Sequence, residues 1–333
     1  MNKKKTKESI SEEYYPISME ILQSFPKYRP KVDLYIFKED IARLYPIAKK
    51  DVRLSNEQLE EIYQACKDEI LFVSRSDQHI YVDLLSKQAE LVLFNSNLLE
   101  SEIVQILMQA LEMRLGLLLE QPLPAYYEPL YKDVMVFCEY IWKDTKRINA
   151  FVPKIETKEF KVAAHGVTAL IIGCWLYLKT RNDDTNRKNF ERLALGLILH
   201  NIGLCKVPAH IVYKDAPLNK EETEKYQAHV RQGAALLNKF GLSHASIIQT
   251  VVEHHERSDG SGYPAHLTGA KISDNGCISI VANAFADLIV SKNGVPRVTT
   301  LEATRQLVKD ASLPVALTGV LLKAYADRYF PDV

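Results

Sequence analysis

The stretch of sequence that decides the fold is residues 254–264, His-His-Glu-Arg-Ser-Asp-Gly-Ser-Gly-Tyr-Pro. Two adjacent imidazoles are costly to bury without polar partners, so they are poor core filling. The glycine-rich turn that follows them favours a cluster of ligands at the mouth of a site. Glu256 and Arg257 either anchor this turn or are solvated. If the interpretation is correct, further ligands must lie elsewhere in the chain.

Three more histidines stand upstream in a region of helical pattern. His200-Asn201 ends an apolar helical segment, whereas His165 and His229 lie within other helical segments. Each of these histidines alone is more often a hydrogen-bonded core or surface residue. Their occurrence together with the pair at residues 254–255 favours one shared polar site.

Helical periodicity runs through almost all of the chain after Tyr126. The expected helices are residues 130–147, 157–179, 189–202, 219–240, 243–255, 278–291 and 300–310. Asn219 and Glu222 have the spacing of a capping box at the start of one of them. These patterns predict an all-α domain.

The N-terminal region mixes short strand and helix signals. Residues 32–37 are rich in strand formers, and residues 70–73 have the pattern of a returning strand. Ser55 and Gln58 form a capping box that opens a helix, and a second helix is expected over residues 77–94. Together these signals predict a small α+β domain.

The order of these regions predicts how the chain is divided into domains. An apolar helical pattern over residues 100–120 is broken by Pro122 and Pro124 and is expected to join two domains. The predicted divisions are a disordered tail over residues 1–13, the α+β domain over 14–95, a helical linker over 96–124 and the all-α domain over 125–333.

Composition excludes several classes of protein. Lysine plus arginine and aspartate plus glutamate number 42 each, so no global charge favours a nucleic-acid polymer. Five dispersed cysteines are typical of a reducing compartment. The longest apolar run, residues 167–178, is shorter than the roughly 20 residues that a bilayer requires. We therefore predict no membrane span and a cytoplasmic protein; the lysine-rich N-terminus is interpreted as a solvated tail.

Residues from about 150 to 290 resemble the HD-GYP family of cyclic di-GMP phosphodiesterases, a branch of the HD metal-dependent phosphohydrolases. The resemblance rests on His200-Asn201-Ile202-Gly203, on His229 and on the turn from Asp259 to Pro264. It implies an HD-type helical bundle around two or three metal ions, often iron or manganese.

The resemblance also implies two ligand sets. The first ion is expected to be bound at positions matching His165, His200 and Asn283. The second is expected at positions matching His229, His254 and His255. A bridging aspartate is expected at the position of Asn201.

Five departures from the family pattern lie at or near this expected site. Asn201 and Asn283 stand where the family has metal-binding aspartates, and an uncharged amide is a poor bridge between two dications. Leu204 and Thr168 replace a lysine and an arginine expected to contact phosphate. Lys161, one helical turn before His165, replaces a glutamate ligand of three-metal family members, and its ammonium would repel a dication. We therefore hypothesise that this ammonium takes part of the electrostatic role of the first ion.

Two alternatives for metal binding remain open. In one, His229, His254 and His255 bind a single divalent ion of iron, manganese or zinc, with Asn201 or water completing the shell. In the other, no metal binds and the histidines only form hydrogen bonds.

The turn itself also has two interpretations. Residues Asp259, Gly260, Gly262, Tyr263 and Pro264 either form a contact surface for substrate or for a partner such as a diguanylate cyclase, or they form a structural turn. In the structural interpretation both glycines supply positive φ and the proline stiffens the exit.

Three functions follow from these patterns and the resemblance. The first is a degenerate HD-GYP protein of cyclic di-GMP signalling, with reduced or lost phosphodiesterase activity and a regulatory or partner-binding role. The second is an active phosphodiesterase with an unusual metal site. The third, a nucleotide sensor without hydrolysis, is disfavoured because the lost phosphate contacts at Thr168 and Leu204 weaken cyclic di-GMP binding.

Overall fold

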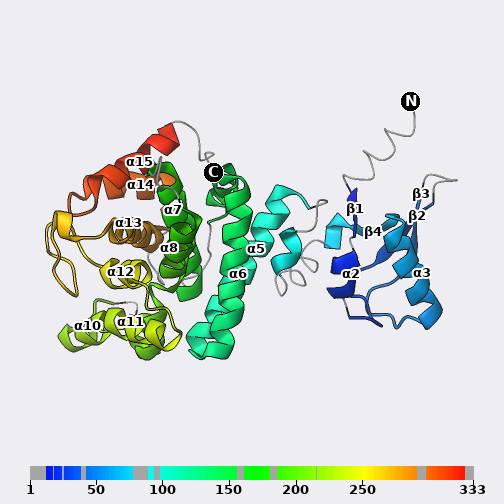
Figure 1. The fold of residues 1–333 in the computed structure, drawn as a ribbon, viewed down its shortest axis with the longest axis horizontal. Helices are drawn as coiled ribbons and strands as arrows, with labels where there is room; N and C mark the ends of the chain where they lie inside the picture. The colour runs from blue at the N-terminus through cyan, green and yellow to red at the C-terminus, as the bar shows by residue number, and fades with distance from the viewer. Residues whose placement is uncertain are drawn as a thin grey trace. The chain divides into compact units, whose positions relative to one another are not determined.

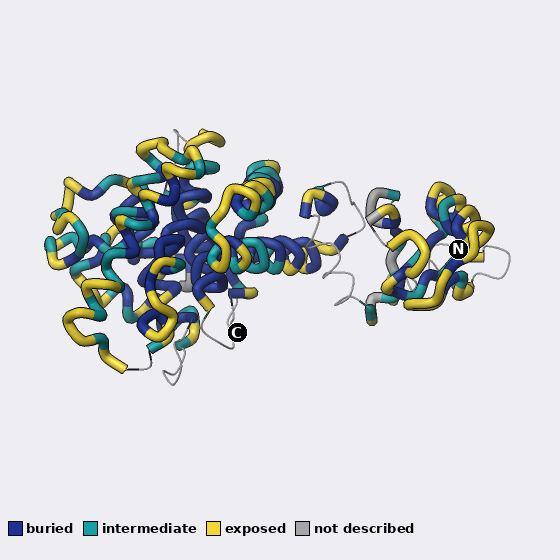
Figure 2. Tube along the Cα trace, turned by 90° about the horizontal axis from the view of Figure 1, so that it is seen from below, coloured by how far each residue is buried: buried dark blue, intermediate teal, exposed yellow. Residues whose placement is uncertain are grey.

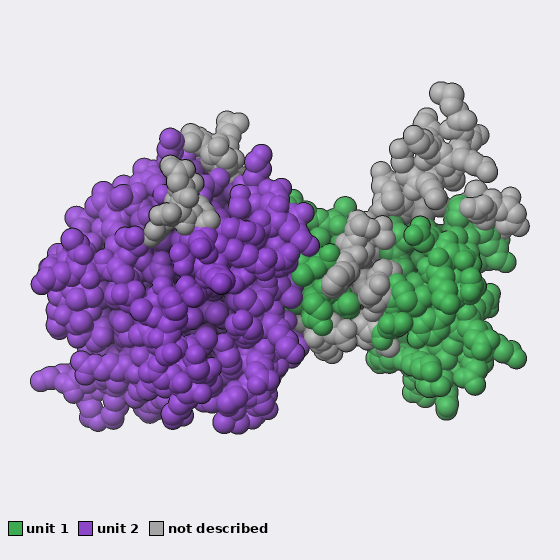
Figure 3. Space-filling view, viewed as in Figure 1, with its two compact units in different colours: residues 1–110 green, residues 111–333 purple. Residues whose placement is uncertain are grey.

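The computed structural model describes residues 13–17, 19–24, 26–38, 43–77, 89–93, 98–155, 161–180, 186–214, 216–290 and 298–326. The chain divides into two compact units, Met1–Ala110 and Leu111–Val333 (Figure 3). This division falls inside helix α5, Glu100–Glu120, which has the bounds that its apolar pattern predicted. The predicted domain boundaries stay a prediction, and the predicted tail lies almost wholly outside the described residues.

The first unit is a small α+β fold, as predicted. Its four-stranded sheet has the order β1-β4-β2-β3 with antiparallel pairing throughout. The strands are β1 Tyr14–Pro16, β2 Leu34–Lys38, β3 Arg43–Ala48 and β4 Leu71–Ser74. The described α-helices that precede α5 are α2 Met19–Ser24 and α3 Asn56–Lys67. Helix α3 begins at the predicted Ser55–Gln58 capping box, in which both hydrogen bonds are present.

The helix expected over residues 77–94 differs from its prediction wherever the structure describes it. Short 3-10 turns occupy Arg75–Asp77 and Ala89–Leu93, and the residues between them lie outside the described part of the chain. Ala89, Leu91 and Val92 are buried. Residues 89–93 therefore pack into the core as a 3-10 turn, and the expectation for residues 78–88 stays a prediction.

The second unit is an all-α bundle, again as predicted (Figure 1). Its helices after α5 are α6 Pro124–Lys143, α7 Val162–Thr180, α8 Arg187–Leu199, α9 Ala209–Val212, α10 Lys220–Gln227, α11 His229–Lys239, α12 Ala245–Glu253, α13 Asp274–Ile289, α14 Thr300–Lys309 and α15 Val315–Ala326. Short 3-10 turns link several of these helices, including Thr145–Ala150 after α6 and Ile202–Lys206 after α8.

Helix α7 is the central element of this bundle. It packs against α8 and α13, and α12 packs against both α8 and α13. Every residue from Val162 to Tyr177 is buried. Buried residues, dark blue in Figure 2, fill the interior of the bundle. By length and composition α7 could cross a membrane, but 89% of its most apolar window is buried inside the fold. Burial on all sides explains the uninterrupted apolar run, so α7 is a core helix.

The segment expected as one helix over residues 219–240 forms two, α10 and α11. The predicted capping box is present. The Asn219 side-chain oxygen accepts from the backbone N–H of Glu222, and the Glu222 carboxylate accepts from the backbone N–H of Asn219. The break falls at Ala228, where the Tyr226 carbonyl accepts a hydrogen bond from the His229 ring. The polar role of His229 therefore interrupts a helix that its sequence pattern would continue.

Candidate metal centre

The bundle brings five histidines and two asparagines together from five helices. His165 and Asn283 lie on α7 and α13, His200-Asn201 follows α8, His229 begins α11 and His254-His255 follows α12. Neighbouring ring centroids are 5.3 Å apart for His165 and His200, 4.9 Å for His200 and His254, 5.2 Å for His229 and His255, and 4.2 Å for His254 and His255. The residues are therefore one cluster.

Three of the rings are oriented by carbonyl groups at the ends of helices. The carbonyls of a last helical turn lack partners within the helix, and here each accepts from the ring three residues further along. The Nδ1···O pairs are His200 with Leu197, His229 with Tyr226 and His254 with Val251, at 2.6, 2.5 and 2.6 Å. Because Nδ1 of each neutral ring carries the hydrogen, Nε2 presents a lone pair.

Two of these lone pairs face each other. His229 Nε2 lies 3.2 Å from His254 Nε2, and neither nitrogen has a hydrogen to donate when Nδ1 is the donor. A metal bound at about 2.0–2.2 Å holds adjacent ligand atoms about 3.0–3.4 Å apart, so this spacing fits two ligands of one ion. His255 Nε2 is buried without a hydrogen-bond partner among the described residues. The ligand atoms of His229, His254 and His255 all lie within 4.8 Å of one another, a set that could hold a metal ion.

Burial keeps these imidazoles neutral. Loss of solvation lowers the pKa of His200 to about 3 and that of His229 to about 4. Burial, followed by the neighbouring rings, also lowers the pKa values of His254 and His255 well below that of an exposed histidine. Neutral imidazole is the form that ligates metals, so His200, His229, His254 and His255 need no deprotonation at neutral pH.

Asn201 lies within the cluster with one unused oxygen. Its Nδ2 is 3.4 Å from His165 Nδ1, and its buried Oδ1 has no hydrogen-bond partner among the described residues. An unpaired buried carbonyl is costly, and an ion or a water would satisfy it. The amide cannot supply the negative charge of an aspartate.

Asp287 is a member of the cluster that the sequence interpretation missed. Its Oδ1 lies 3.0 Å from His165 Nε2, and its Oδ2 accepts from Asn283 Nδ2 at 3.2 Å. Asn283 Oδ1 lies 3.2 Å from His200 Nε2. Asp287 follows Asn283 by one helical turn and therefore shares its face of α13, a spacing that could have revealed it. Asp287 therefore adds a carboxylate to the cluster, one helical turn after Asn283.

The side chains at the three other departures from the family pattern make contacts outside the histidine cluster. The Thr168 hydroxyl donates to the Ala164 carbonyl on its own helix. Leu204 is buried in an apolar cluster with Val162 and neighbouring residues. Lys161 is exposed and lines a separate cavity of about 400 Å³ beside Leu204. No contact between its ammonium and the histidines occurs among the described residues, so the hypothesis that it replaces an ion has no support in this geometry.

The turn after His255 is anchored from within the fold. The fully buried Glu256 carboxylate accepts from the Ala265 and Leu267 amides at 2.7 and 2.9 Å, which decides the open question of its role. The exposed Asp259 accepts from Ser261 at the outer edge of the turn.

Glycine is required at the two positions of the turn for different physical reasons. Gly260 has φ of +81°, as predicted, but Gly262 is not among the positive-φ residues. A Cβ on Gly262 would lie 2.4 Å from Glu256 Cα, so close backbone packing requires glycine there. The packing brings Tyr263 onto His255, with stacked rings whose centroids are 4.6 Å apart and whose planes differ by 19°. The turn therefore covers the ring of His255 through Tyr263.

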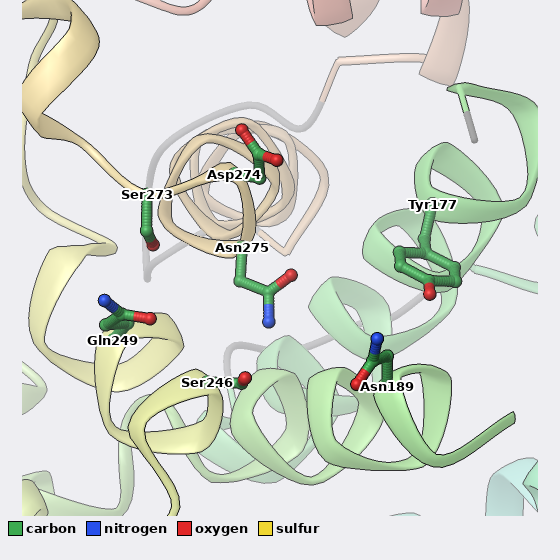
Figure 4. Close-up of a pocket in the computed structure, with 7 residues that line it drawn as sticks. All are labelled: Tyr177, Asn189, Ser246, Gln249, Ser273, Asp274 and Asn275. Atoms are coloured by element: carbon green, nitrogen blue, oxygen red, sulfur yellow. The ribbon is translucent and has the colours of Figure 1, made fainter. Parts of the chain in front are cut away.

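A second cavity, of about 280 Å³, lies between other ends of the same helices (Figure 4). Its lining residues are Tyr177, Asn189, Ser246, Gln249, Ser273, Asp274 and Asn275. The lining contains no histidine of the cluster and no cationic side chain, so it lacks the groups that bind phosphate.

Comparisons with known proteins place this site in context. Residues 157–313 match the family model described as HD domain. The 3'3'-cGAMP-specific phosphodiesterase 2 of Vibrio cholerae is 34% identical over 26% of this chain and 17% of its own length. The cyclic di-GMP phosphodiesterase of Thermotoga maritima is 35% identical over 34% of this chain and 31% of its own length. Cyclic di-GMP phosphodiesterase PdeB of Borreliella burgdorferi is 32% identical over 38% and 33%. The matches thus span a third or less of these relatives.

A solved structure shares the fold over nearly the whole chain. It is Bd1817, an HDG"Y"P protein from Bdellovibrio bacteriovorus, with a TM-score of 0.62 and 18% sequence identity. The alignment covers 94% of this chain and 99% of that chain. The similarity shows a common fold for both units.

Proposed function

Because this chain belongs to the HD-GYP family of HD domain proteins, we propose that it is a metal-binding regulatory protein of cyclic di-GMP signalling with weak or lost phosphodiesterase activity. The observation that carries this proposal is Asn201. It stands at the position of the bridging aspartate, inside an otherwise intact histidine cluster, with its Oδ1 buried and unpartnered among the described residues.

The expected loss of activity follows from charge. A bound divalent ion lowers the pKa of its water ligand and so supplies a nucleophile near neutral pH. Here His229, His254 and His255 would hold such an ion, with Asn201 Oδ1 or water beside them. The neutral Asn201 amide contributes no negative charge to draw two ions together, so a bridged pair is disfavoured.

Ligand binding is expected to be weakened as well. A cyclic dinucleotide carries two phosphodiesters, which proteins bind most strongly through arginine and lysine. Thr168 and Leu204, at the two matching positions, are buried in contacts within the fold. The proposed output is therefore contact with a protein of the same signalling system, such as a diguanylate cyclase, in the cytoplasm. The turn from Asp259 to Pro264 is the proposed contact surface, because it presents an exposed edge beside the cluster.

An active phosphodiesterase with an unusual metal site is the second candidate. Asp287 favours it, because this carboxylate contacts His165 and restores one negative charge to the cluster. The comparisons also favour it, since the relatives named above are described as phosphodiesterases.

The two candidates are separated by a direct assay. Purified protein is incubated anaerobically with cyclic di-GMP or 3'3'-cGAMP and with Fe²⁺ or Mn²⁺, and linear products are quantified by chromatography. The first candidate predicts turnover at least about 100-fold below that of an active relative measured in parallel, a loss of about 2.7 kcal/mol in transition-state stabilisation. Comparable turnover that disappears in His254→Ala would instead establish the second candidate.

A further inference from the structure

Two neighbouring loops of the first unit form an exposed basic patch. Residues 26–31, between α2 and β2, lie beside residues 49–54, between β3 and α3. The backbone N–H of Asp51 donates to the Pro30 carbonyl at 2.8 Å, and that of Leu54 donates to the Tyr28 carbonyl at 2.9 Å. These bonds bring together six exposed cations, here called the basic patch: Lys27, Arg29, Lys31, Lys49, Lys50 and Arg53.

The carboxylates beside the basic patch neutralise only part of its charge. Lys31 Nζ pairs with the Asp51 carboxylate at 2.6 Å, and the Asp33 carboxylate accepts from the backbone N–H of Lys50. Within the described part of the chain the other five cations of the patch make no ion pair: Lys27, Arg29, Lys49, Lys50 and Arg53. A local excess of positive charge is therefore available to an anionic partner, although the whole chain is neutral.

Two exposed apolar side chains lie within the basic patch. Tyr28 is 43% exposed and Val52 is 53% exposed. The residues on both sides of Tyr28 are cations, and Val52 lies between Lys50 and Arg53. Tyrosine suits the boundary between lipid headgroups and acyl chains, and an exposed aliphatic side chain gains by entering it. Nucleic-acid bases would stack on tyrosine, but valine has no ring to offer them. The combination therefore favours a lipid surface.

We propose that the basic patch docks the first unit on an anionic membrane surface, with Tyr28 and Val52 at the level of the lipid headgroups. Each lysine or arginine close to such a surface strengthens binding by about fivefold. This attraction falls off within a Debye length, about 8 Å at physiological ionic strength, so position within the unit matters. The contact is peripheral and goes beyond the proposed function, because it depends neither on a metal ion nor on a cyclic dinucleotide.

The same unit contains exposed cations outside the basic patch, which supply a matched control. Leu34 pairs with Ala48 at the patch end of the β2–β3 hairpin, whereas Lys38 pairs with Arg43 at the other end, about 14 Å away. Lys67 is the last residue of α3, which begins beside the patch and is about 17 Å long. These three cations therefore lie more than a Debye length from the patch.

The test is sedimentation of the full chain with vesicles of phosphatidylcholine that contain about 30% phosphatidylserine, at physiological salt. We expect the wild type to bind these vesicles and not vesicles of phosphatidylcholine alone. The triple variant Lys49→Gln, Lys50→Gln and Arg53→Gln should bind about 100-fold more weakly, because three cations near the surface are lost. Circular dichroism should show unchanged folding, since all three side chains are exposed.

The control variant removes the same number of charges from the same unit. It carries Lys38→Gln, Arg43→Gln and Lys67→Gln, and its vesicle binding should stay within about threefold of the wild type, because these positions are screened from the surface. Equal losses in the two triple variants would show attraction to net charge without a docking surface and would overturn the inference.

A third variant tests the apolar contact with every cation retained. Tyr28→Ser with Val52→Ser should weaken vesicle binding by about tenfold, because apolar insertion is lost. Unchanged binding of this variant overturns the assignment to a membrane, and so does a wild type that leaves the anionic vesicles unbound. A parallel titration with a single-stranded RNA and a duplex DNA covers the other anionic partner. Tighter binding to either one than to the vesicles would assign the patch to nucleic acid and overturn the inference.

Discussion

Replacing Glu256 with glutamine should detach the turn that covers the ring of His255. Glu256 is fully buried, and its two carboxylate oxygens accept from the Ala265 and Leu267 amides at 2.7 and 2.9 Å. The turn packs so closely on Glu256 that a Cβ on Gly262 would lie 2.4 Å from its Cα. Tyr263, between these contacts, stacks on His255. The carboxylate therefore supports the position of a candidate metal ligand.

The size of the effect follows from the two hydrogen bonds. Glutamine keeps one acceptor oxygen, but its NH₂ group meets the other backbone N–H, which leaves that donor without a partner. A buried unsatisfied donor costs about 1–3 kcal/mol, and the remaining bond loses the extra strength of a charged acceptor, about 1 kcal/mol. We therefore expect Glu256→Gln to lower the free energy of unfolding by about 2–4 kcal/mol.

Urea unfolding followed by circular dichroism measures this loss, and metal titration of the folded variant measures its effect on His255. Asp259→Asn is the matched control, because Asp259 lies in the same turn but is exposed and an amide oxygen can still accept from Ser261. It should change stability by less than about 1 kcal/mol. If Glu256→Gln unfolds within about 0.5 kcal/mol of the wild type, the carboxylate does not anchor the turn, and the reasoning is refuted.

Three further predictions concern the same bundle. Gly203→Ala places a Cβ 1.9 Å from the His229 carbonyl oxygen and should lower the free energy of unfolding, measured with urea, by at least about 3 kcal/mol. Gly116→Ala, with open space around its Cβ, is the control and should be neutral or stabilising. Equal stabilities of the two variants would contradict the packing around Gly203. Folded-state pKa values of about 3 for His200 and about 4 for His229 lie below the unfolded value of about 6.5, so the unfolded chain binds more protons between these limits. The metal-free protein should therefore be most stable above pH 6.5 and should lose about 1.4 kcal/mol per pH unit for each such histidine as the pH falls, and a flat profile from pH 7 to 5 would show that the rings are not buried as neutral groups. Asn201→Asp should raise Mn²⁺ affinity at least about tenfold in a chelator competition, because a charged ligand replaces a neutral one, and an unchanged affinity would argue against charge as the limiting factor.

Local sequence determined much of the bundle and the start of several helices. The pattern over residues 100–120 gave the bounds of α5, and Ser55 and Asn219 gave the starts of α3 and α10. These features depend on side chains a few residues apart, which is why they can be predicted from the sequence alone. The edge strand β3 and helix α15 were not predicted. Strand β3 is stabilised by pairing with β2, and its own alternation is interrupted by Pro46.

The histidines and asparagines of the candidate metal centre were predicted from their resemblance to a family pattern. The contacts that other residues make with them were not predicted. Because Asn201 and Asn283 are uncharged, the sequence predicted a cluster without negative charge. A sequence shows which residue occupies a matched position, but it does not show which distant residues contact that position in the fold. Asp287 and His165 are 122 residues apart, and only the packing of α13 on α7 brings them within 3.0 Å. Sequence by itself determined the imidazoles and the helices that carry them. Only the tertiary structure shows that the Asp287 carboxylate lies beside these imidazoles, because electrostatic interactions act through space and depend on how the helices pack.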